Sequence, residues 1–423
     1  MTEHKRVFLK AKEEKELLQG FPWVFDNEID YIRIDTKDST GKKITIQTSL
    51  SDTTLPQGTL VDVCSKAGQY LGTGILNLTS KISVRLISKK NIENGLPIQF
   101  DRKFFVKRLE DALALRKPFF SEEDSFRLVF AEADFFPGLI VELYRDCNQK
   151  VVLVVQFLAL ATEVFREIII EALKIVIEPD YIYERSDASV RNLEGLEEKK
   201  GWIFGSYETK IIIKENDVLL EVDIENGQKT GYFLDQKFNR KQACLFAQNK
   251  KVLDTCTHTG AFGLNCVKAG AKEVIAVDIS PEAIETVEHN IALNNAQKTM
   301  KTLCGDVFEV LKQYEKNNEK FDMIILDPPA FTKSAKAVQK AYGGYKEINL
   351  RAMKILEKGG ILVTCSCSHF FDENTFYAML MNAAQDAHRT IQILEKRGAA
   401  PDHPVLVGYP KSEYLKCAIL RVL

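Results

Sequence analysis

The pattern of apolar and polar residues changes twice along this 423-residue chain. Up to about residue 90, short apolar runs alternate with turn residues, which predicts strands. Glycines within these runs permit bulges and sharp coiling of a sheet. The alternating stretch KISVRLISKK (81–90) places its apolar side chains on one face of a strand and Arg85 on the other. This part is predicted to form a small β-barrel, in which the face bearing Arg85 is either a solvated strand edge or an RNA contact.

The next stretch mixes helical and strand patterns. In residues 101–117, apolar Phe105, Leu109 and Ala112 recur at helical spacing. The basic residues expected on the exposed surface of this helix are Lys103, Lys107, Arg108 and Arg116. Three strand-like runs and a helix at about 162–176 follow, and a polar, Gly-bearing stretch at 194–206 marks a boundary. Residues 91–205 are therefore predicted to form a central α+β domain.

From about residue 251, apolar runs alternate with amphipathic helices. The runs KVLDTC, EVIAVDIS, FDMIILDPP and GGILVTCSCS are typical of buried strands. Such strands, alternating with helices, predict a parallel sheet covered on both faces. Ser280-Pro281 is a typical helix start, because Ser caps the helix and Pro suits its first turn. The fold class expected for residues 206–423 is α/β, with a doubly wound, Rossmann-like sheet.

Composition and charge narrow the class of protein. Hydrophobic residues make up 45% and charged residues 27% of the chain, which indicates a soluble globular protein and excludes collagen-like and disordered chains. The 57 basic and 59 acidic side chains nearly cancel, so no strong global field attracts nucleic acid or membranes. Residues 1–110 nevertheless hold 18 basic against 14 acidic side chains. This mild excess predicts a polyanion contact in the N-terminal part.

The cysteines and the apolar runs exclude several further classes. The nine cysteines form no C-x-x-C pair and cluster poorly with the six histidines, so neither a zinc site nor a disulfide framework is expected. No apolar run reaches the ~18 residues of a membrane span, and the first residues lack the apolar core of a secretory signal. The sequence predicts a cytoplasmic protein without a metal or a membrane contact.

Acidic residues follow four of the predicted buried strands. In doubly wound sheets, ligands bind beyond the carboxyl ends of the strands. The turn after the first strand, Asp254 to Gly260, leads into a helix but lacks the G-x-G-x-x-G pattern of NAD-binding proteins. Asp278 ends the second strand, where a carboxylate can accept both hydroxyls of a ribose. Gly305-Asp306-Val307 follows the third strand and suits the polar edge and the face of an adenine, and Asp327 follows the fourth.

A helix cap would explain any one of these acidic residues, but four in this order resemble the class I S-adenosylmethionine-dependent methyltransferases. The cofactor-binding residues expected on this resemblance are Asp254, Thr257, Gly260, Asp278, Ile279, Asp306 and Val307.

Two neighbouring strand ends carry the candidate reaction chemistry. The segment Asp327-Pro-Pro-Ala-Phe331 defines a rigid turn that can read a nucleobase, and by itself it leaves adenine N6, guanine and cytosine C5 chemistry open. The next strand carries Cys365 and Cys367, with Cys367 nearer the carboxyl end, where substrate would lie. A thiolate is a soft nucleophile, and its addition to C6 activates C5 of a cytosine. We expect Cys365 to be a core residue, Cys367 to be the nucleophile, and Asp327 to stabilise the adduct at its N3 edge.

Longer segments identify a family. They are FPWVF (21–25), GQYLGTG (68–74), RLVFAEAD (127–134), PGL (137–139), YERSD (183–187), VR (190–191), GQKTGYFLDQKFNR (227–240), DPPAF (327–331), GYK (344–346), TCSCS (364–368) and DHP (402–404). With these segments, the chain resembles the RlmI-type family of large-subunit ribosomal RNA cytosine-C5 methyltransferases over nearly its whole length.

This resemblance implies three domains: a PUA-like RNA-binding domain (1–90), a central EEHEAD-like RNA-binding domain (91–205) and a class I methyltransferase domain with an N-terminal hairpin (206–423). It also implies S-adenosylmethionine as cofactor, large-subunit (23S) ribosomal RNA as partner, a homodimer, Cys367 as nucleophile and Gln236 near the methionine end of the cofactor. Many RNA cytosine-C5 methyltransferases carry a second cysteine where this chain has Pro329. The base that removes the C5 proton is therefore not identified.

Two other functions fit the sequence. Methylation of a guanine or adenine amino group in RNA would use the Asp327 turn equally well and needs no thiol. A non-catalytic RNA-binding ribosome assembly factor would keep the fold without turnover, but the full set of acidic strand ends together with Cys367 disfavours it.

Overall fold

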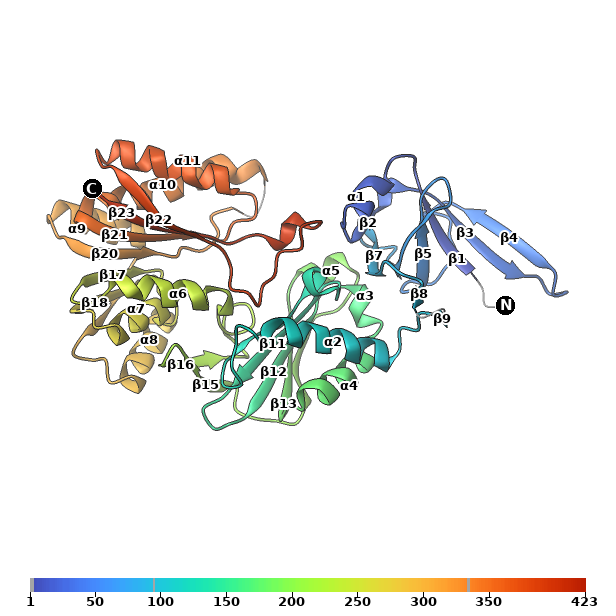
Figure 1. Cartoon of the computed structure of the whole chain (residues 1–423), viewed down its shortest axis with the longest axis horizontal. Coiled ribbons are helices and arrows are strands. Elements are labelled where there is room, and N and C mark those ends of the chain that lie inside the picture. The colour runs from blue at the N-terminus through green and yellow to red at the C-terminus, as the bar shows by residue number, and fades with distance from the viewer. Residues whose placement is uncertain (1–3, 94–95, 333–334) are drawn as a thin grey trace.

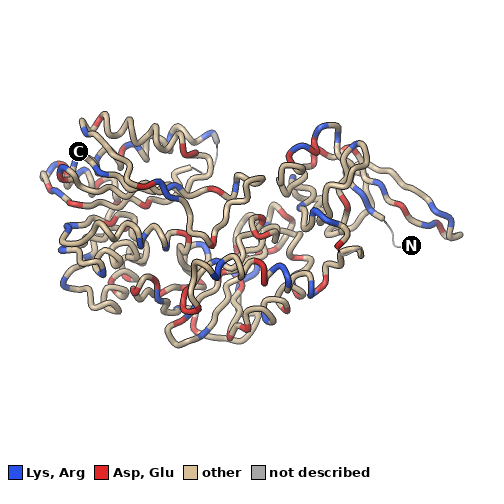
Figure 2. Tube along the Cα trace, in the orientation of Figure 1, with Lys and Arg blue, Asp and Glu red and all other residues tan. Residues whose placement is uncertain are grey.

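The computed structural model describes residues 4–93, 96–332 and 335–423. Figure 1 shows a mainly β unit (blue), a central unit (teal to green) and a larger α/β unit (yellow to red). The central unit lies between the other two, and the long connection before β23 reaches from the α/β unit toward both. Figure 2 shows Lys and Arg interspersed with Asp and Glu along all three units. None of the helices in the described ranges is long and apolar enough to cross a membrane.

The N-terminal unit is built on one seven-stranded sheet with the order β2-β7-β6-β5-β1-β3-β4. Its elements are β1 (His4–Leu9), α1 (Glu14–Leu18), β2 (Trp23–Phe25), η1 (Asp26–Glu28), β3 (Ile29–Lys37), β4 (Lys43–Thr48), β5 (Leu60–Cys64), β6 (Tyr70–Leu76) and β7 (Ile82–Ser88), followed by the hairpin β8 (Ile92–Glu93) and β9 (Leu96–Pro97). The register of β6 against β7 shifts at Thr73/Gly74. A Cβ on Gly74 would lie 2.3 Å from the Arg85 carbonyl oxygen, so this bulge requires glycine.

Arg85 corrects one expectation from the sequence. Its strand β7 pairs with both β2 and β6, and its side chain is buried. The guanidinium donates to Glu132 and Glu194 of the central unit, each at 2.9 Å. A solvated edge and an RNA contact are therefore both wrong for Arg85, because the central unit covers this face of the strand.

The central unit contains a five-stranded sheet with the order β10-β11-β12-β13-β14. Its elements are α2 (Arg102–Arg116), β10 (Phe126–Phe130), η2 (Ala131–Asp134), β11 (Leu139–Arg145), β12 (Val151–Phe157), α3 (Leu160–Glu163), α4 (Arg166–Ile177), β13 (Tyr181–Ser186), α5 (Val190–Leu193) and β14 (Lys199–Phe204). Phe105 and Leu109 of α2 pack into the core that this sheet shares with α4, as the helical spacing predicted.

Arg116, at the end of α2, also differs from expectation. It is fully buried rather than on the surface. Its guanidinium forms two 2.6 Å hydrogen bonds to Asp134 and also donates to the Arg127 carbonyl at 2.9 Å. A bidentate carboxylate is the partner that allows an arginine to be buried.

The α/β unit follows a two-stranded hairpin, β15 (Lys210–Glu215) and β16 (Val218–Asp223). Its seven-stranded sheet has the order β19-β18-β17-β20-β21-β23-β22. The strands are β17 (Lys251–Thr255), β18 (Glu273–Asp278), β19 (Met300–Cys304), β20 (Phe321–Leu326), β21 (Leu356–Ser366), β22 (Ile391–Arg397) and β23 (Lys416–Val422). The helices are η3 (Leu234–Gln236), α6 (Lys237–Ala243), η4 (Cys244–Phe246), α7 (Ala261–Lys268), α8 (Pro281–Leu293), α9 (Val307–Lys316), η5 (Ala335–Ala337), α10 (Val338–Ile355), α11 (Glu373–Asp386) and η6 (Pro410–Ser412).

Helices cover both faces of this sheet, which confirms the predicted fold class. Strands β17 to β21 pair in parallel, and β23 runs antiparallel to both of its neighbours. Val252 packs in the core shared with α7 and α8, whereas the adjacent Leu253 packs in the core shared with α10 and α11. The chain passes from β17 to β18 and β19 on one side and then to β20 on the other. This reversal between β17 and β20 is where doubly wound sheets bind ligands.

Candidate active site

A cavity of about 350 Å³ opens at this reversal point. Its wall is formed by residues that follow β17, β18, β19, β20 and β21 and by the segment between the hairpin and α6. Of the ten site residues predicted from the sequence, eight line it: Gln236, Thr257, Asp278, Ile279, Asp306, Val307, Asp327 and Cys367. Tertiary structure therefore brings together side chains that the sequence spreads over more than 130 positions.

Asp254 and Gly260 lie behind the cavity wall. Asp254 is 1% exposed and accepts hydrogen bonds from the Thr257 hydroxyl at 2.5 Å and the Gly263 amide at 2.9 Å. Burial raises the pKa of Asp254 to about 7. Gly260 precedes α7 with φ +80°, and a Cβ there would lie 3.0 Å from Val287. Both residues shape the turn after β17 and thereby position Thr257 at the cavity.

Three of the lining residues, Asp278, Ile279 and Asp306, suit an adenosine group. Asp278 accepts hydrogen bonds from the backbone amides of His258 at 2.9 Å and Ser280 at 3.1 Å, and Asp306 caps α9 through the Phe308 amide at 2.8 Å. Carboxylate oxygens accept more than one hydrogen bond, so both side chains can also bind ligand hydroxyls or amines. Ile279 lines the cavity although it is 66% exposed, which leaves an apolar surface that a flat ring would cover. These residue types fit the nucleoside part of S-adenosylmethionine.

A chain of hydrogen bonds holds Asp327, which lines the same cavity. The Gln236 amide donates to Asp327 at 3.0 Å, the Asn239 amide donates to Gln236 at 2.6 Å, and Arg397 donates to Asn239 at 2.9 Å. Burial raises the pKa of Asp327 to about 6, and the nearby Asp235 carboxylate adds to this effect. Asp327 can therefore exchange a proton near neutral pH.

Cys367 lies directly beyond the end of β21 and faces the cavity. Cys365 is fully buried within the strand and lies opposite Cys417 in the register between β21 and β23. This burial confirms its predicted place in the core. Burial raises the pKa of the Cys367 thiol and the Asp327 carboxylate raises it further, whereas the Lys229 ammonium lowers it. These surroundings favour the protonated thiol over the thiolate.

Lys229 and Asp235 were not among the predicted site residues. The Lys229 ammonium lies 3.3 Å from the Asp235 carboxylate and 4.4 Å from the centre of the Phe233 ring, and all three residues line the cavity. Tyr414 donates a hydrogen bond to Asp235. The segment 227–240 was already prominent in the sequence, but no strand or helix pattern assigns a direction to its side chains.

Tyr232 and Arg240, from the same segment, form hydrogen bonds that hold this segment against the β15–β16 hairpin. The Tyr232 hydroxyl donates to Glu215 at 3.0 Å, and Arg240 donates to it at 2.5 and 2.9 Å. All three side chains are buried, so this cluster ties the hairpin to the segment beside the cavity.

Tyr345 of α10 joins the turns that carry the two proposed catalytic residues. Its hydroxyl shares a 2.9 Å hydrogen bond with Ser368, the residue after Cys367. Its ring centre lies 4.5 Å from that of Phe331, in the turn that begins with Asp327. The sequence motif Gly344-Tyr-Lys346 contained this residue without indicating its contact.

Among residues 4–93, 96–332 and 335–423, no group of three or more His, Cys, Asp or Glu side chains is arranged to hold a metal ion.

Two family models match the chain. A PUA-like domain matches residues 7–89, and an S-adenosylmethionine-dependent methyltransferase matches residues 129–410. Curated relatives match along the full length. A protein of Aliivibrio fischeri named ribosomal RNA large subunit methyltransferase I is 37% identical, and one of the same name from Tolumonas auensis is 38% identical, each with 99% of both chains covered.

The structural comparison supports the same fold. A Streptococcus mutans structure described as a SAM-dependent methyltransferase superposes with a TM-score of 0.77 at 20% identity, covering 98% of this chain and 99% of its own. A second structure, described as a methyltransferase complexed with SAH, has the same TM-score, identity and coverage. S-adenosylmethionine is the cofactor of the matched methyltransferase family. The chain belongs to the S-adenosylmethionine-dependent methyltransferase family, among full-length relatives named ribosomal RNA large subunit methyltransferase I.

Proposed function

We propose that this chain methylates C5 of a cytosine in large-subunit ribosomal RNA through a covalent bond from Cys367 to C6 of the base. The names of the full-length relatives support large-subunit ribosomal RNA as the substrate. The observation that carries the C5 chemistry is the position of Cys367, a thiol on the same cavity wall as Asp327 and the strand-end carboxylates. Amino-group methylation gives no reason for a thiol at this place.

Each end of the cavity has its own task in this proposal. Asp278 and Asp306 bind the hydroxyls and the adenine edge of the cofactor, and Ile279 and Val307 cover the adenine ring. Thr257 binds next to them, held by Asp254 and by the turn at Gly260. Gln236 lies toward the methionine end, beside Asp327. When bound, S-adenosylmethionine supplies an electrophilic methyl group.

Cys367 and Asp327 perform the reaction on the base. Cys367 loses its proton to solvent and forms a bond from Sγ to C6, which shifts electron density onto C5 and makes it nucleophilic enough to accept the methyl group. The Lys229 ammonium favours the thiolate. Asp327, whose pKa is about 6, donates a proton or a hydrogen bond to N3 as the adduct forms. The C5 proton then leaves to solvent, the bond between Sγ and C6 breaks, any proton donated to N3 returns to Asp327, and the aromatic ring is restored.

The test is to incubate the protein with methyl-labelled S-adenosylmethionine and unmodified large-subunit ribosomal RNA, and to analyse the nucleosides by mass spectrometry. Labelled 5-methylcytidine is expected. A labelled N-methylated purine would instead establish amino-group methylation. Absence of label on both free RNA and immature ribosomal particles would favour a non-catalytic assembly factor.

A further inference from the structure

A second cavity, of about 380 Å³, lies where the three units meet. The N-terminal unit contributes Lys89 and Lys90, which directly follow β7, and the central unit contributes Arg108 and Phe135. Leu406, from the connection between β22 and β23, completes the wall. Two basic stretches that are separate in the sequence, 81–90 and 101–117, therefore meet at one cavity.

Arg108 has an unusual environment for a basic side chain. Its guanidinium lies 4.4 Å from the centre of the Phe104 ring and 5.7 Å from that of Phe136, and it donates one hydrogen bond, of 2.5 Å, to the Phe135 carbonyl. Within the described ranges it forms no ion pair, whereas the neighbouring Lys107 is 2.8 Å from Asp111. A guanidinium has five N–H donors, so most of its hydrogen-bonding capacity remains available to a ligand.

The two lysines of the cavity add to this positive character, and its one carboxylate is already paired. Lys89 donates only to a carbonyl, that of Leu17 at 2.8 Å, and neither it nor Lys90 has an ion pair among the residues that the structure describes. Glu132 also lines the cavity, but its Oε1 accepts hydrogen bonds from Arg85 at 2.9 Å and from Trp23 at 2.8 Å. The cavity therefore keeps three cations against one carboxylate that is already paired.

Phe135 presents an aromatic ring beside these cations. It is 57% exposed and has φ +62°, a conformation that is rare for a bulky residue. The backbone is held on both sides, because Asp134 is bonded to Arg116 and Phe136 is buried in the core. An exposed ring next to unpaired cations is the combination with which proteins bind single-stranded nucleic acid, stacking a base and neutralising phosphates.

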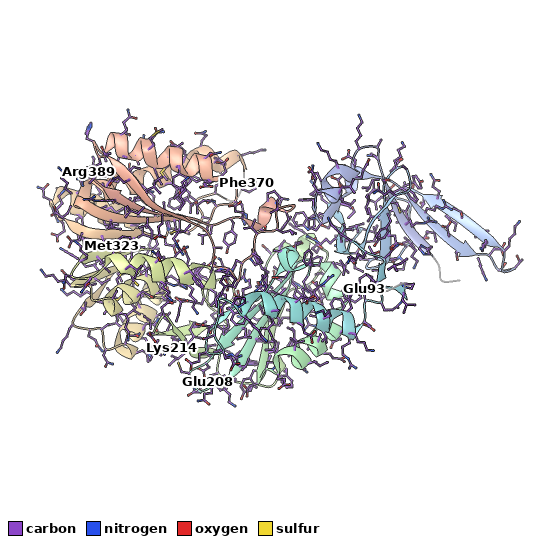
Figure 3. The ribbon with its side chains drawn as sticks, in the orientation of Figure 1. Glu93, Glu208, Lys214, Met323, Phe370 and Arg389 are labelled. Atoms are coloured by element: carbon purple, nitrogen blue, oxygen red, sulfur yellow. The ribbon has the colours of Figure 1, made fainter. Side chains whose placement is uncertain are left out.

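The connection between β22 and β23 borders both cavities. Leu406 lines the second cavity and Leu415 lines the first. Val407 on this connection is 91% exposed. Figure 3 labels Phe370, which is 50% exposed and follows Cys367 by three residues, on the side of the α/β unit that faces the N-terminal unit. A strand of RNA in the second cavity would therefore lie along a segment that also borders the reaction site.

We infer that the second cavity binds a single-stranded segment of the RNA substrate, with phosphates on Lys89, Lys90 and Arg108 and one base against Phe135. This inference rests on RNA as the substrate of the proposed function, but it is independent of which base is methylated.

The test measures the affinity of the full-length protein for an unmodified large-subunit rRNA transcript over a range of salt concentrations. The variants are Lys90→Gln, Arg108→Gln and Phe135→Asn, since Asn tolerates the left-handed backbone conformation. Lys107→Gln is the matched control, because it removes the same charge from the same helix outside the cavity. Thermal unfolding and calorimetry with S-adenosylmethionine show that each variant is folded.

The two charge variants are expected to lower the affinity by roughly tenfold and to reduce the slope of log K against log salt by about one. Phe135→Asn should lower the affinity by about tenfold without changing that slope, because stacking is not ionic. Lys107→Gln should match the wild type. Lys90 is exposed, so its replacement tests the cavity even if Arg108→Gln fails to fold.

Wild-type affinity and slope in Lys90→Gln and Phe135→Asn would overturn the inference, as would failure of the wild-type protein to bind the transcript. The two proposals can fail separately. If the variants lose RNA affinity but the wild type forms no labelled 5-methylcytidine, only the C5 chemistry is wrong. If the variants form 5-methylcytidine with the KM and kcat of the wild type, only the assignment of the second cavity to RNA binding is wrong.

Discussion

The side-chain amide of Gln236 donates a 3.0 Å hydrogen bond to the carboxyl group of Asp327. Gln236 belongs to η3 and Asp327 follows β20, 91 positions later in the chain. Asn239 and Arg397 hold Gln236 in turn. These contacts orient the carboxyl group of Asp327, the proposed catalytic residue, before any ligand binds. The hydrogen bond from Gln236 also lowers the pKa of Asp327, which partly opposes the increase caused by burial.

We expect Gln236→Ala to reduce kcat by about 10- to 100-fold with a smaller change in KM, because the buried Asp327 loses its positioning donor. Steady-state methylation kinetics measure both constants. Gln242→Ala is the control, since Gln242 bonds to Glu395 outside the cavity. An unchanged kcat in Gln236→Ala would show that this hydrogen bond does not position the reacting group.

Replacing the proposed nucleophile should separate chemistry from cofactor binding. Cys367→Ser is expected to reduce single-turnover methyl transfer by about three orders of magnitude, because a hydroxyl is a far weaker nucleophile than a thiolate. Its affinity for S-adenosylmethionine, measured by calorimetry, should stay within about twofold. Cys365→Ala, two residues away in the core, should keep its turnover and lose about 1 to 2 kcal/mol of stability. Full single-turnover transfer by Cys367→Ser would exclude the covalent mechanism.

Asp327 makes the stability of the protein depend on pH. Burial raises its pKa from 3.8 to about 6 in the folded state. Below pH 3.8 both the folded and the unfolded chain carry this proton. As the pH rises from 3.8 to about 6, the unfolded chain releases the proton while the folded chain still holds it, so the free energy of unfolding decreases. Above pH 6 both states have lost the proton, and the decrease remains constant. Asp327→Asn should therefore be more stable than wild type at pH 8, by at most about 3 kcal/mol.

Urea denaturation of both proteins at pH 4 and pH 8 measures this difference, which should nearly vanish at pH 4. The same variant should lose methylation activity. An equal difference in unfolding free energy at both pH values would mean that the pKa of Asp327 is not raised in the folded protein.

The cofactor end of the cavity can be tested without RNA. Asp278→Asn is expected to weaken binding of S-adenosylmethionine by about tenfold, since one charged acceptor for the ribose is lost while the contacts to the turn are largely kept. Calorimetry gives the dissociation constant. Glu285→Gln, an exposed position on the helix that follows, should bind the cofactor as the wild type does. Equal affinities for all three proteins would remove Asp278 from the cofactor site.

The contact between the N-terminal and central units depends on buried charge. Arg85→Met leaves Glu132 and Glu194 without their shared cation and should destabilise this contact by about 3 to 5 kcal/mol. Limited proteolysis should cleave between the units faster, and denaturation should show the N-terminal unit separating first. Arg33→Met is the control, because its ion pair with Asp35 is partly exposed. Equal protection of Arg85→Met and wild type would show that the other contacts suffice.

Local sequence was enough to predict the α/β fold class and the acidic residues at the strand ends. Alternation and helical spacing depend on near neighbours, and parallel strands bring their carboxyl ends to one edge whatever the loops between them contain. Cys365 and Cys367 have different environments because β21 ends between them, at Ser366. Cys365 lies within the buried strand, and Cys367 lies beyond its carboxyl end. Asp254 and Gly260 also occur at the expected positions after a strand, but they do not line the cavity. Whether such a residue faces the ligand or supports the turn depends on the direction of its side chain, which the sequence pattern does not give.

The basic residues show what only the tertiary structure decided. From the sequence, Arg85, Arg108 and Arg116 are alike: each is a cation on the polar face of a strand or helix. In the structure, Arg85 and Arg116 are buried against carboxylates distant in the chain, whereas Arg108 lies beside a cavity without such a partner among the described residues. The sequence by itself determined where the cations are and which elements carry them. Their partners depend on long-range contacts, and a charge is buried or left to a ligand according to whether a carboxylate meets it there.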